Sequence, residues 1–330
     1  MTQRSLITDV TGVRVGHAQD ERLGSGVTAV VFDTPVAASI DVRGGGPGTR
    51  ETALLDPAQT IEGIDAIALS GGSAFGLDAA SGVQAYMRDQ GRGFQVRTAR
   101  VPIVPAAILF DLLAGGDKNW QRYPPYRELG YEAAENAGVD FVLGSVGAGL
   151  GATTVNFKGG VGSASAVTVS GITVGALAAV NAAGSVTVGD GPHFWAAPFE
   201  QGNEFGGRGL PSSFPAAALV MRTKGAPQEN TTLAVVATDA ELTKAQCNRL
   251  AVMAQTGLAR AIYPVHTPLD GDVTFAAATG HRPLADPVFA LAELGTLAAN
   301  VLARAVARGV YQATALAFAG ALPAWHDRHR

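Results

Sequence analysis

One threonine hydroxyl in this sequence is placed so that it could act as a nucleophile. Thr231 follows Asn230 at the end of a stretch rich in proline and glycine, and it opens the apolar run 231–239, which is typical of a buried strand. A hydroxyl needs a base nearby to become a good nucleophile. If the chain is cut directly before Thr231, the new α-amino group supplies one, because its pKa of about 8 suits neutral pH. The sequence therefore permits a latent N-terminal nucleophile at Thr231.

Such a nucleophile needs helpers, and the sequence offers candidates for them. Asp270 and Asp272 flank a glycine in a predicted turn and could hold the ammonium–hydroxyl pair. Asn181 and backbone amides could stabilise an oxyanion. The chain break would arise if the Thr231 hydroxyl attacked the Asn230 carbonyl and water then hydrolysed the ester. The ordinary alternatives are a solvated turn or a cation-binding loop at 270–272 and a chance Asn-Thr-Thr tripeptide.

Other segments resemble functional motifs only in part. Residues 70–76 read Ser-Gly-Gly-Ser-Ala-Phe-Gly, which fits neither a serine nucleophile elbow nor a phosphate-binding loop. Close packing of a strand on a helix explains these glycines, with backbone amides at a helix start as the alternative. Residues 147–152 mimic a dinucleotide fingerprint without its strand–helix context. Cys247 is the single cysteine, so an intrachain disulfide and a cysteine metal cluster are excluded. We expect no cofactor and no metal.

The bulk composition narrows the class of protein. The chain has 330 residues, 47% hydrophobic and 16% charged, with a net charge of −4, which does not suggest a nucleic-acid partner. The N-terminal residues have no apolar core typical of a signal peptide. The uncharged span 167–189 is long enough to cross a membrane, but it begins with alternating apolar and hydroxyl residues, which favours strands. We expect a cytoplasmic protein with no membrane partner.

The periodicity predicts interleaved strands and helices without a linker or a repeat, hence one α/β domain with helices outside sheets. Short β-type runs are expected at 7–15, 26–32, 39–43, 65–70, 214–221 and 273–278. Helices are expected at 73–89, 126–137, 241–261 and 287–315, with Phe75 on the apolar stripe of the first.

Several segments taken together resemble one family. They read TDVTGVRVGH at 8–17, DVRGGGPG at 41–48, LSGGSAFGL at 69–77, NTT at 230–232 and DGD at 270–272. In this order they resemble the L-aminopeptidase/D-amino-acid esterase-amidase family, which includes β-aminopeptidases and 6-aminohexanoate-oligomer hydrolases. The resemblance runs from about residue 5 to residue 315.

The resemblance implies a self-processing N-terminal-nucleophile hydrolase with a four-layer αββα sandwich over residues 1–330. The chain would split into an α-chain of residues 1–230 and a β-chain of residues 231–330, which stay together and assemble into homo-oligomers, commonly tetramers. The substrate would be a small peptide or amide. Many relatives carry serine where this chain has threonine, so the substrate preferences of the serine branch are not implied.

The resemblance also assigns roles residue by residue. Thr231 matches the nucleophile and Asn230 the residue before the cut. Asp270 and Asp272 match the acidic pair of the family, and Lys158 and Asn181 match the polar residues beside the family's nucleophile. A family tyrosine near the site has two candidates in the aromatic loop, of which Tyr126 is preferred to Tyr123 as a pocket wall.

Two other functions stay open. An acyltransferase of the ornithine-acetyltransferase type would use the same threonine, although the sequence usual in those enzymes is not found around Thr231. A non-enzymatic ligand-binding protein would use 270–272 as a cation loop and keep its chain intact.

Overall fold

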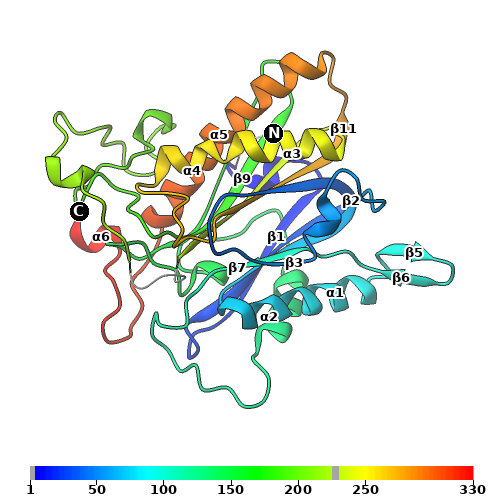
Figure 1. Ribbon diagram of the computed structural model, residues 1–330, viewed down its shortest axis with the longest axis horizontal. Coiled ribbons are helices and arrows are strands. Elements are labelled where there is room, and N and C mark those ends of the chain that lie inside the picture. The colour runs from blue at the N-terminus through cyan, green and yellow to red at the C-terminus, as the bar shows by residue number, and fades with distance from the viewer. Residues whose placement is uncertain (1–3, 225–229, 330) are drawn as a thin grey trace.

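The computed structural model describes residues 4–224 and 230–329, and two helical layers enclose two layers of strands in it (Figure 1). The strands are β1 (Val13–Asp20), β2 (Ser25–Val42), β3 (Gly48–Arg50), β4 (Ile64–Ser70), β5 (Phe94–Val96), β6 (Ala99–Val101), β7 (Ala106–Ile108), β8 (Gly160–Val167), β9 (Thr173–Asn181), β10 (Thr231–Ala240) and β11 (Val273–Arg282). The helices are α1 (Ala79–Asp89), α2 (Tyr126–Glu135), α3 (Lys244–Ala254), α4 (Thr256–Ala261), α5 (Pro287–Tyr311) and α6 (Trp325–Arg328). The chain also forms 3₁₀ turns at Ile7–Asp9, Ala53–Leu55, Ser73–Asp78, Gly147–Gly149, Ala197–Phe199 and Ala216–Leu219.

The long strand β2 links the two sheet layers. Its first half pairs with β1 and β4, and its second half pairs with β11. The hydrogen-bonded order is β3-β7-β4-β2-β11-β10-β9-β8, with β1 on the side of β2 and a separate β5–β6 hairpin. The two apolar runs expected at 26–32 and 39–43 are thus parts of one bent strand.

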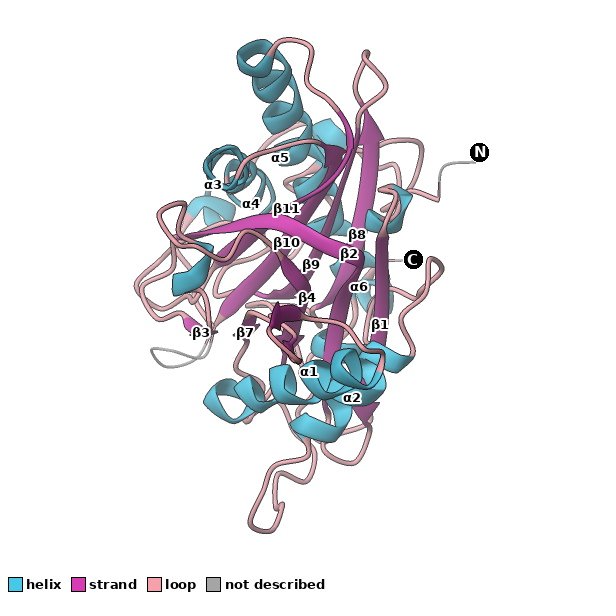
Figure 2. Ribbon diagram, turned by 90° about the vertical axis from the view of Figure 1, so that its right-hand side faces the viewer, coloured by secondary structure: helices cyan, strands magenta, loops and turns pink. Residues whose placement is uncertain are grey.

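Three apolar clusters separate the layers. The central cluster joins residues of both sheets, such as Phe32, Ile67, Leu233 and Phe275, and it is fully shielded from solvent. A second cluster lies between α3, α4, α5 and the sheet of β8–β11, and a third lies between α1, α2 and the other sheet. Figure 2 shows the strands enclosed by these helices. The architecture confirms the predicted αββα sandwich.

Strands β10 and β11 run parallel, so a crossover must join them. Helices α3 and α4 provide it. The Thr243 hydroxyl accepts the Gln246 N–H at the start of α3, and Asp286 accepts two backbone N–H groups at the start of α5, where Pro287 takes the first position. Helix α5, which is rich in alanine, confirms the long helix that the sequence predicts from residue 287 onward. It is long and apolar enough to cross a bilayer, and half of its most apolar window is buried here.

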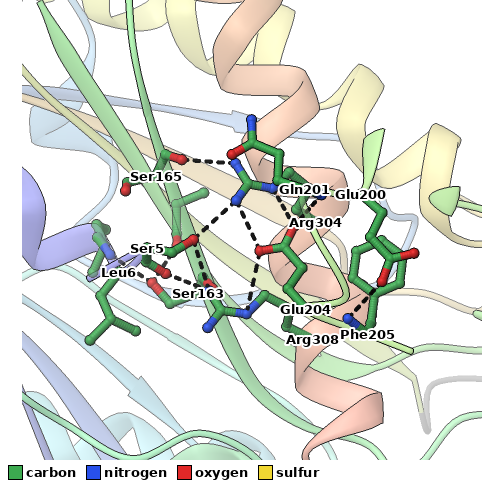
Figure 3. Close-up of polar contacts among 12 residues, drawn as sticks. Ser5, Leu6, Ser163, Ser165, Glu200, Gln201, Glu204, Phe205, Arg304 and Arg308 are labelled. Carbon is green, nitrogen blue, oxygen red and sulfur yellow. Dashed lines mark hydrogen bonds and ion pairs between the residues drawn. The ribbon is translucent and has the colours of Figure 1, made fainter. Parts of the chain in front are cut away.

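A buried charge cluster fastens α5 to the sheet and to the N-terminal segment (Figure 3). Arg304, with a side chain 2% exposed, donates through Nε and Nη2 to the Glu204 carboxylate at 2.5 and 2.9 Å. The same guanidinium donates to the Ser165 carbonyl and to the Ser5 hydroxyl. Arg308 donates to the carbonyls of Ser5 and Ser163. The cluster therefore joins four segments that are distant in sequence.

Four details of the secondary-structure prediction are wrong. Residues 214–221 form an exposed 3₁₀ turn instead of a strand, because Pro215 precedes it without an N–H for a ladder. Phe75 is 51% exposed, so it does not belong to the apolar stripe of the first helix. Residues 7–9 form a 3₁₀ turn, and β1 begins only at Val13. The helix expected at 241–261 is divided at Gln255 into α3 and α4. Residues 225–229, at the end of the irregular stretch, lie outside the described residues.

Candidate active site

Thr231 is the first residue of β10 and lies between the two sheets. It pairs with Asn181 across the antiparallel β9–β10 ladder. Its neighbour Leu233 contributes to the central cluster, so by alternation the Thr231 side chain points toward the same face. Only 4% of the residue is exposed. The start of β10 thus fixes the hydroxyl at the end of a rigid, buried strand, as the sequence predicts.

The peptide bond before Thr231 has an unusual environment. The Asn230 carbonyl oxygen accepts a hydrogen bond from the Gly271 N–H at 2.8 Å. It also accepts one from the Thr231 hydroxyl at 2.5 Å. The first contact is a part of the parallel bridge between Asn230 and Asp270. A carbonyl with two donors is polarised toward attack at its carbon, and the attacking oxygen is already beside it.

Gly271 is glycine because another side chain occupies the space of a Cβ. A Cβ at this position would lie 2.7 Å from the Thr231 Oγ1 and 2.8 Å from the Gly46 carbonyl oxygen. The glycine cluster 44–46 covers this turn. Its Gly46 N–H donates to the Asp270 carbonyl at 2.8 Å, and a Cβ on Gly44 would lie 2.3 Å from the Asp272 nitrogen. Close backbone approach thus explains the glycines at 44–46 and at 271.

The carboxylates of Asp270 and Asp272 accept hydrogen bonds through all four of their oxygens. Asp272 accepts the Thr232 N–H at 2.7 Å through Oδ1, and it accepts the His266 Nδ1 at 3.0 Å and the His266 N–H at 3.2 Å through Oδ2. Asp270 accepts the Ala183 N–H through Oδ1. The N–H and hydroxyl of Thr267 donate to Oδ2 of Asp270.

Both acids are buried, at 2% and 1% exposure for Asp270 and Asp272. Burial raises the pKa of Asp270, and the neighbouring Asp272 charge raises it further, while the bonds from Thr267 and Ala183 oppose the shift. Asp272 bonds to the N–H of Thr232, the residue after Thr231, and Asp270 bonds to the N–H of Ala183, whereas the Thr231 hydroxyl donates to the Asn230 carbonyl. In this arrangement the acidic pair fixes the turn whose central N–H group reaches the Asn230 carbonyl.

Asn181 connects the nucleophile strand to a cavity. Its Oδ1 accepts the Thr153 N–H at 3.0 Å and the Lys224 ammonium at 2.8 Å, and its Nδ2 donates to the Phe110 carbonyl at 3.0 Å. These three partners line a cavity of about 280 Å³ together with Leu113, Ala114, Gly115, Ala319, Gly320, Ala321 and Leu322. Most of the lining residues are apolar and a few are polar, which is typical of a substrate pocket, and Asn181 links this cavity to Thr231, its partner in the ladder.

Lys158 pairs through its backbone with Thr153, one of the residues that line the cavity, and it is 1% exposed. Its ammonium donates to the carbonyls of Gly149, Ala152 and Gly159 at 2.7–2.8 Å. Burial lowers the pKa of Lys158 to about 7, and the charge of buried Asp111 partly offsets this. The lysine thus holds the loop that carries Thr153, and it reaches Asn181 only through that loop.

Tyr126 lies in a separate buried cluster below α1. Its hydroxyl donates to Ser25 at 3.1 Å, and Ser25 donates to Asp111 at 2.6 Å. Burial, followed by the Asp111 charge, raises the pKa of Tyr126. The Tyr126 ring fills the space where a Cβ of Gly72 would lie, at 2.1 Å, and the φ of +82° at Gly72 also favours glycine. Close packing therefore explains the glycines at 71–72.

Comparison with known proteins decides the family. The model of peptidase family S58 matches residues 5–321. An uncharacterized aminopeptidase of Mycobacterium bovis is 44% identical over 342 residues, covering 97% of each chain. The 6-aminohexanoate-oligomer endohydrolase of Kocuria sp. is 27% identical, covering 91% of this chain and 82% of that protein. The chain belongs to peptidase family S58.

Solved structures confirm the fold of this S58 protein. The Burkholderia sp. β-aminopeptidase superposes with a TM-score of 0.71 at 24% identity, covering 97% of this chain and 90% of that chain. The L-aminopeptidase D-Ala-esterase/amidase of Ochrobactrum anthropi, described as a variant of the N-terminal-nucleophile hydrolase fold, gives a TM-score of 0.69 at 23% identity, covering 94% and 87% of the two chains. These structures show the fold, whereas the family and its aminopeptidase relative show that the chain is a peptidase or amidohydrolase, so the non-enzymatic hypothesis is wrong.

The structure brings some predicted site residues together and leaves others apart. Asn230, Thr231, Asn181 and the two acids meet at the edge of β9–β11. Lys158 and Tyr126 contact other groups, and their roles stay predictions, as do the tetramer and the cytoplasmic location.

Sequence reasoning missed Lys224, His266, Thr267 and the Gly271 amide. A backbone amide leaves no signal in sequence. His266 and Thr267, however, stand just before the acidic turn, where a polar pair could have been weighed.

Proposed function

We propose that this S58 chain cuts itself between Asn230 and Thr231, and that Thr231 then hydrolyses amides as an N-terminal nucleophile. One observation carries the proposal. The Asn230 carbonyl accepts the Gly271 N–H while the Thr231 hydroxyl lies against the same oxygen.

The cut is an acyl shift followed by hydrolysis. The Thr231 oxygen attacks the Asn230 carbonyl carbon, and the developing oxyanion keeps the hydrogen bond from the Gly271 N–H. The C–N bond breaks as the proton of the attacking hydroxyl is transferred to the Thr231 nitrogen, which leaves an ester between Asn230 and the Thr231 oxygen. Water then hydrolyses the ester, giving an Asn230 carboxylate and a free Thr231 with hydroxyl and α-amino group.

The two chains stay together because the strands of one chain lie between strands of the other in one sheet. β10 and β11 belong to residues 231–330, while their outer neighbours β9 and β2 belong to residues 1–230. The Arg304–Glu204 pair adds a buried contact between the two parts. Cutting one peptide bond removes no ladder hydrogen bond between these strands.

In turnover, the Thr231 oxygen attacks a substrate amide carbon while the α-amino group takes the hydroxyl proton and passes it to the leaving amine. The acyl-enzyme ester is then hydrolysed by water. Asn181 lies opposite Thr231 in the ladder and contacts three residues that line the cavity. We place the acyl group of a small peptide or amide substrate in that cavity.

The test is a pair of isosteric substitutions. Thr231→Val removes the nucleophile, and Thr232→Val makes the same change one residue later, where the hydroxyl has no partner among the described residues. Intact-mass analysis should show two fragments, beginning at Met1 and Thr231, for wild type and Thr232→Val, and one chain of 33.6 kDa for Thr231→Val. Only the cleaved proteins should hydrolyse small amides. A single-chain wild type, or a Thr231→Val variant that still hydrolyses amides, refutes the proposal. Adding an acceptor amine separates hydrolysis from acyl transfer.

A further inference from the structure

The two acids near Thr231 are held in the same way. Each uses one oxygen on the strand side, where Asp270 accepts Ala183 N–H and Asp272 accepts Thr232 N–H. Each uses its other oxygen on two donors of one loop residue, Thr267 for Asp270 and His266 for Asp272. The orientation of both carboxylates therefore depends on the adjacent pair His266 and Thr267.

His266 has a backbone conformation that needs a reason. Its φ is +54°, in the left-handed region, which is unfavourable for a residue with a Cβ. This conformation turns both the N–H and the Nδ1 of His266 toward the same Asp272 oxygen, at 3.2 and 3.0 Å. An unfavourable conformation that yields two donors on one buried carboxylate points to a requirement for Asp272 in a fixed orientation.

The charge of the site leads to the same residue. Asp270 and Asp272 are both buried, and the described chain gives them one ion-pair partner, His266 at Asp272. The segment 43–45 that covers the loop contributes only backbone N–H groups, from Arg43 and Gly44 to the Asp272 carbonyl and from Gly45 to the Thr267 carbonyl.

We propose that His266 is a positioning residue for self-cleavage and turnover, acting through Asp272. It orients Asp272, Asp272 fixes the Thr232 N–H, and the start of β10 thereby holds the Asn230–Thr231 bond against the Gly271 amide. An imidazolium at this position would place a positive charge 3.0 Å from the Asp272 oxygen, beside two acids that both accept hydrogen bonds as carboxylates. This inference rests on the proposed self-cleavage.

Three variants separate these contributions. His266→Gly removes the side chain but tolerates a positive φ and keeps the backbone N–H. His266→Asn also tolerates that φ and restores a neutral donor near the position of Nδ1. His281→Asn is the control, because His281 is exposed and lies near the end of β11, whereas the acids precede its start.

The measurement is the rate of precursor cleavage between pH 4.5 and 9, followed by intact mass after cell-free synthesis, together with amide turnover. We expect His266→Gly to slow cleavage by about 10–100-fold, the scale of a misplaced reacting group. His266→Asn should regain the plateau rate within about threefold, but the acidic limb of its profile should move up by about half a pH unit or more, because the positive charge is gone. His281→Asn should match wild type.

Either of two results overturns the proposal. His266→Gly could cleave and turn over like wild type, or His266→Asn could keep the wild-type acidic limb. If His266→Gly does not fold, the profile of His266→Asn still decides. Failure of the proposed function looks different, because the wild type itself would then remain a single chain.

Discussion

Gly271→Ala gives the sharpest test of the self-cleavage geometry. The added methyl group would lie 2.7 Å from the Thr231 Oγ1 and 2.8 Å from the Gly46 oxygen, where carbon and oxygen normally stay about 3.2–3.4 Å apart. Gly271 is not among the residues with a positive φ, so alanine meets no backbone penalty. The turn must therefore move by about half an ångström away from Thr231, and the 2.8 Å bond from the Gly271 N–H to the Asn230 carbonyl lengthens or breaks.

Loss of one oxyanion donor typically slows acyl chemistry by about 10²–10³-fold, and we expect that loss in the cleavage rate. Overpacking should cost about 1–3 kcal/mol of unfolding free energy, which leaves a folded precursor. The assay is the time course of the two fragments by intact mass, with thermal unfolding measured in parallel. Gly138→Ala is the matched control, since its nearest atom would be 3.6 Å away and its φ is not positive. A Gly271→Ala precursor that folds and cleaves within about threefold of wild type would show that this amide is not the donor.

Three further predictions concern the nucleophile and two buried charges. Thr231→Ser keeps the attacking oxygen, so fragments should still form and amide hydrolysis should stay within about tenfold of wild type. Arg304→Met leaves the Glu204 carboxylate with the Gln201 N–H at 3.2 Å and with Arg308 at 3.8 Å as its charged partner. Urea unfolding should show a loss of about 3 kcal/mol, whereas exposed Arg14→Met should lose less than about 1 kcal/mol. Burial lowers the pKa of Lys158 to about 7, so between about pH 7 and 9 the folded chain releases this proton before the unfolded chain does. The unfolding free energy of wild type minus that of Lys158→Met should therefore rise with pH over this window, and a flat or falling difference would contradict the assignment.

Much of the architecture was predictable, because burial leaves periodic signals in the sequence. The apolar run after Asn230 became β10, and the helical stripe from Pro287 onward became α5. The uncharged span 167–189 contains strand β9, as expected, although most of its alternating residues form the turn between β8 and β9. The predictions failed where tertiary packing overruled the local pattern. Phe75, for example, is apolar but half exposed, and it packs edge-on against Trp120.

Part of the site was also predictable. A threonine at the start of a buried strand and a pair of acids around a glycine are visible as residue types and spacings, and they do meet in the fold. The hydrogen bond that joins these two parts of the site links Thr232 to Asp272, which are 40 residues apart in sequence. No local sequence pattern indicates that the parallel register of β10 and β11 places Asn230 beside Asp270.

The sequence by itself determined the layers, the strand that carries Thr231 and the candidates around it, since these follow from hydrophobic period and residue chemistry. Only the tertiary structure decided that the Gly271 N–H reaches the Asn230 carbonyl and that His266 holds Asp272. It also decided that the Lys158 ammonium donates its hydrogen bonds to three backbone carbonyls. The physical reason is that these contacts use backbone groups and strand register, which depend on the path of the whole chain and not on the identity of the residues beside Thr231.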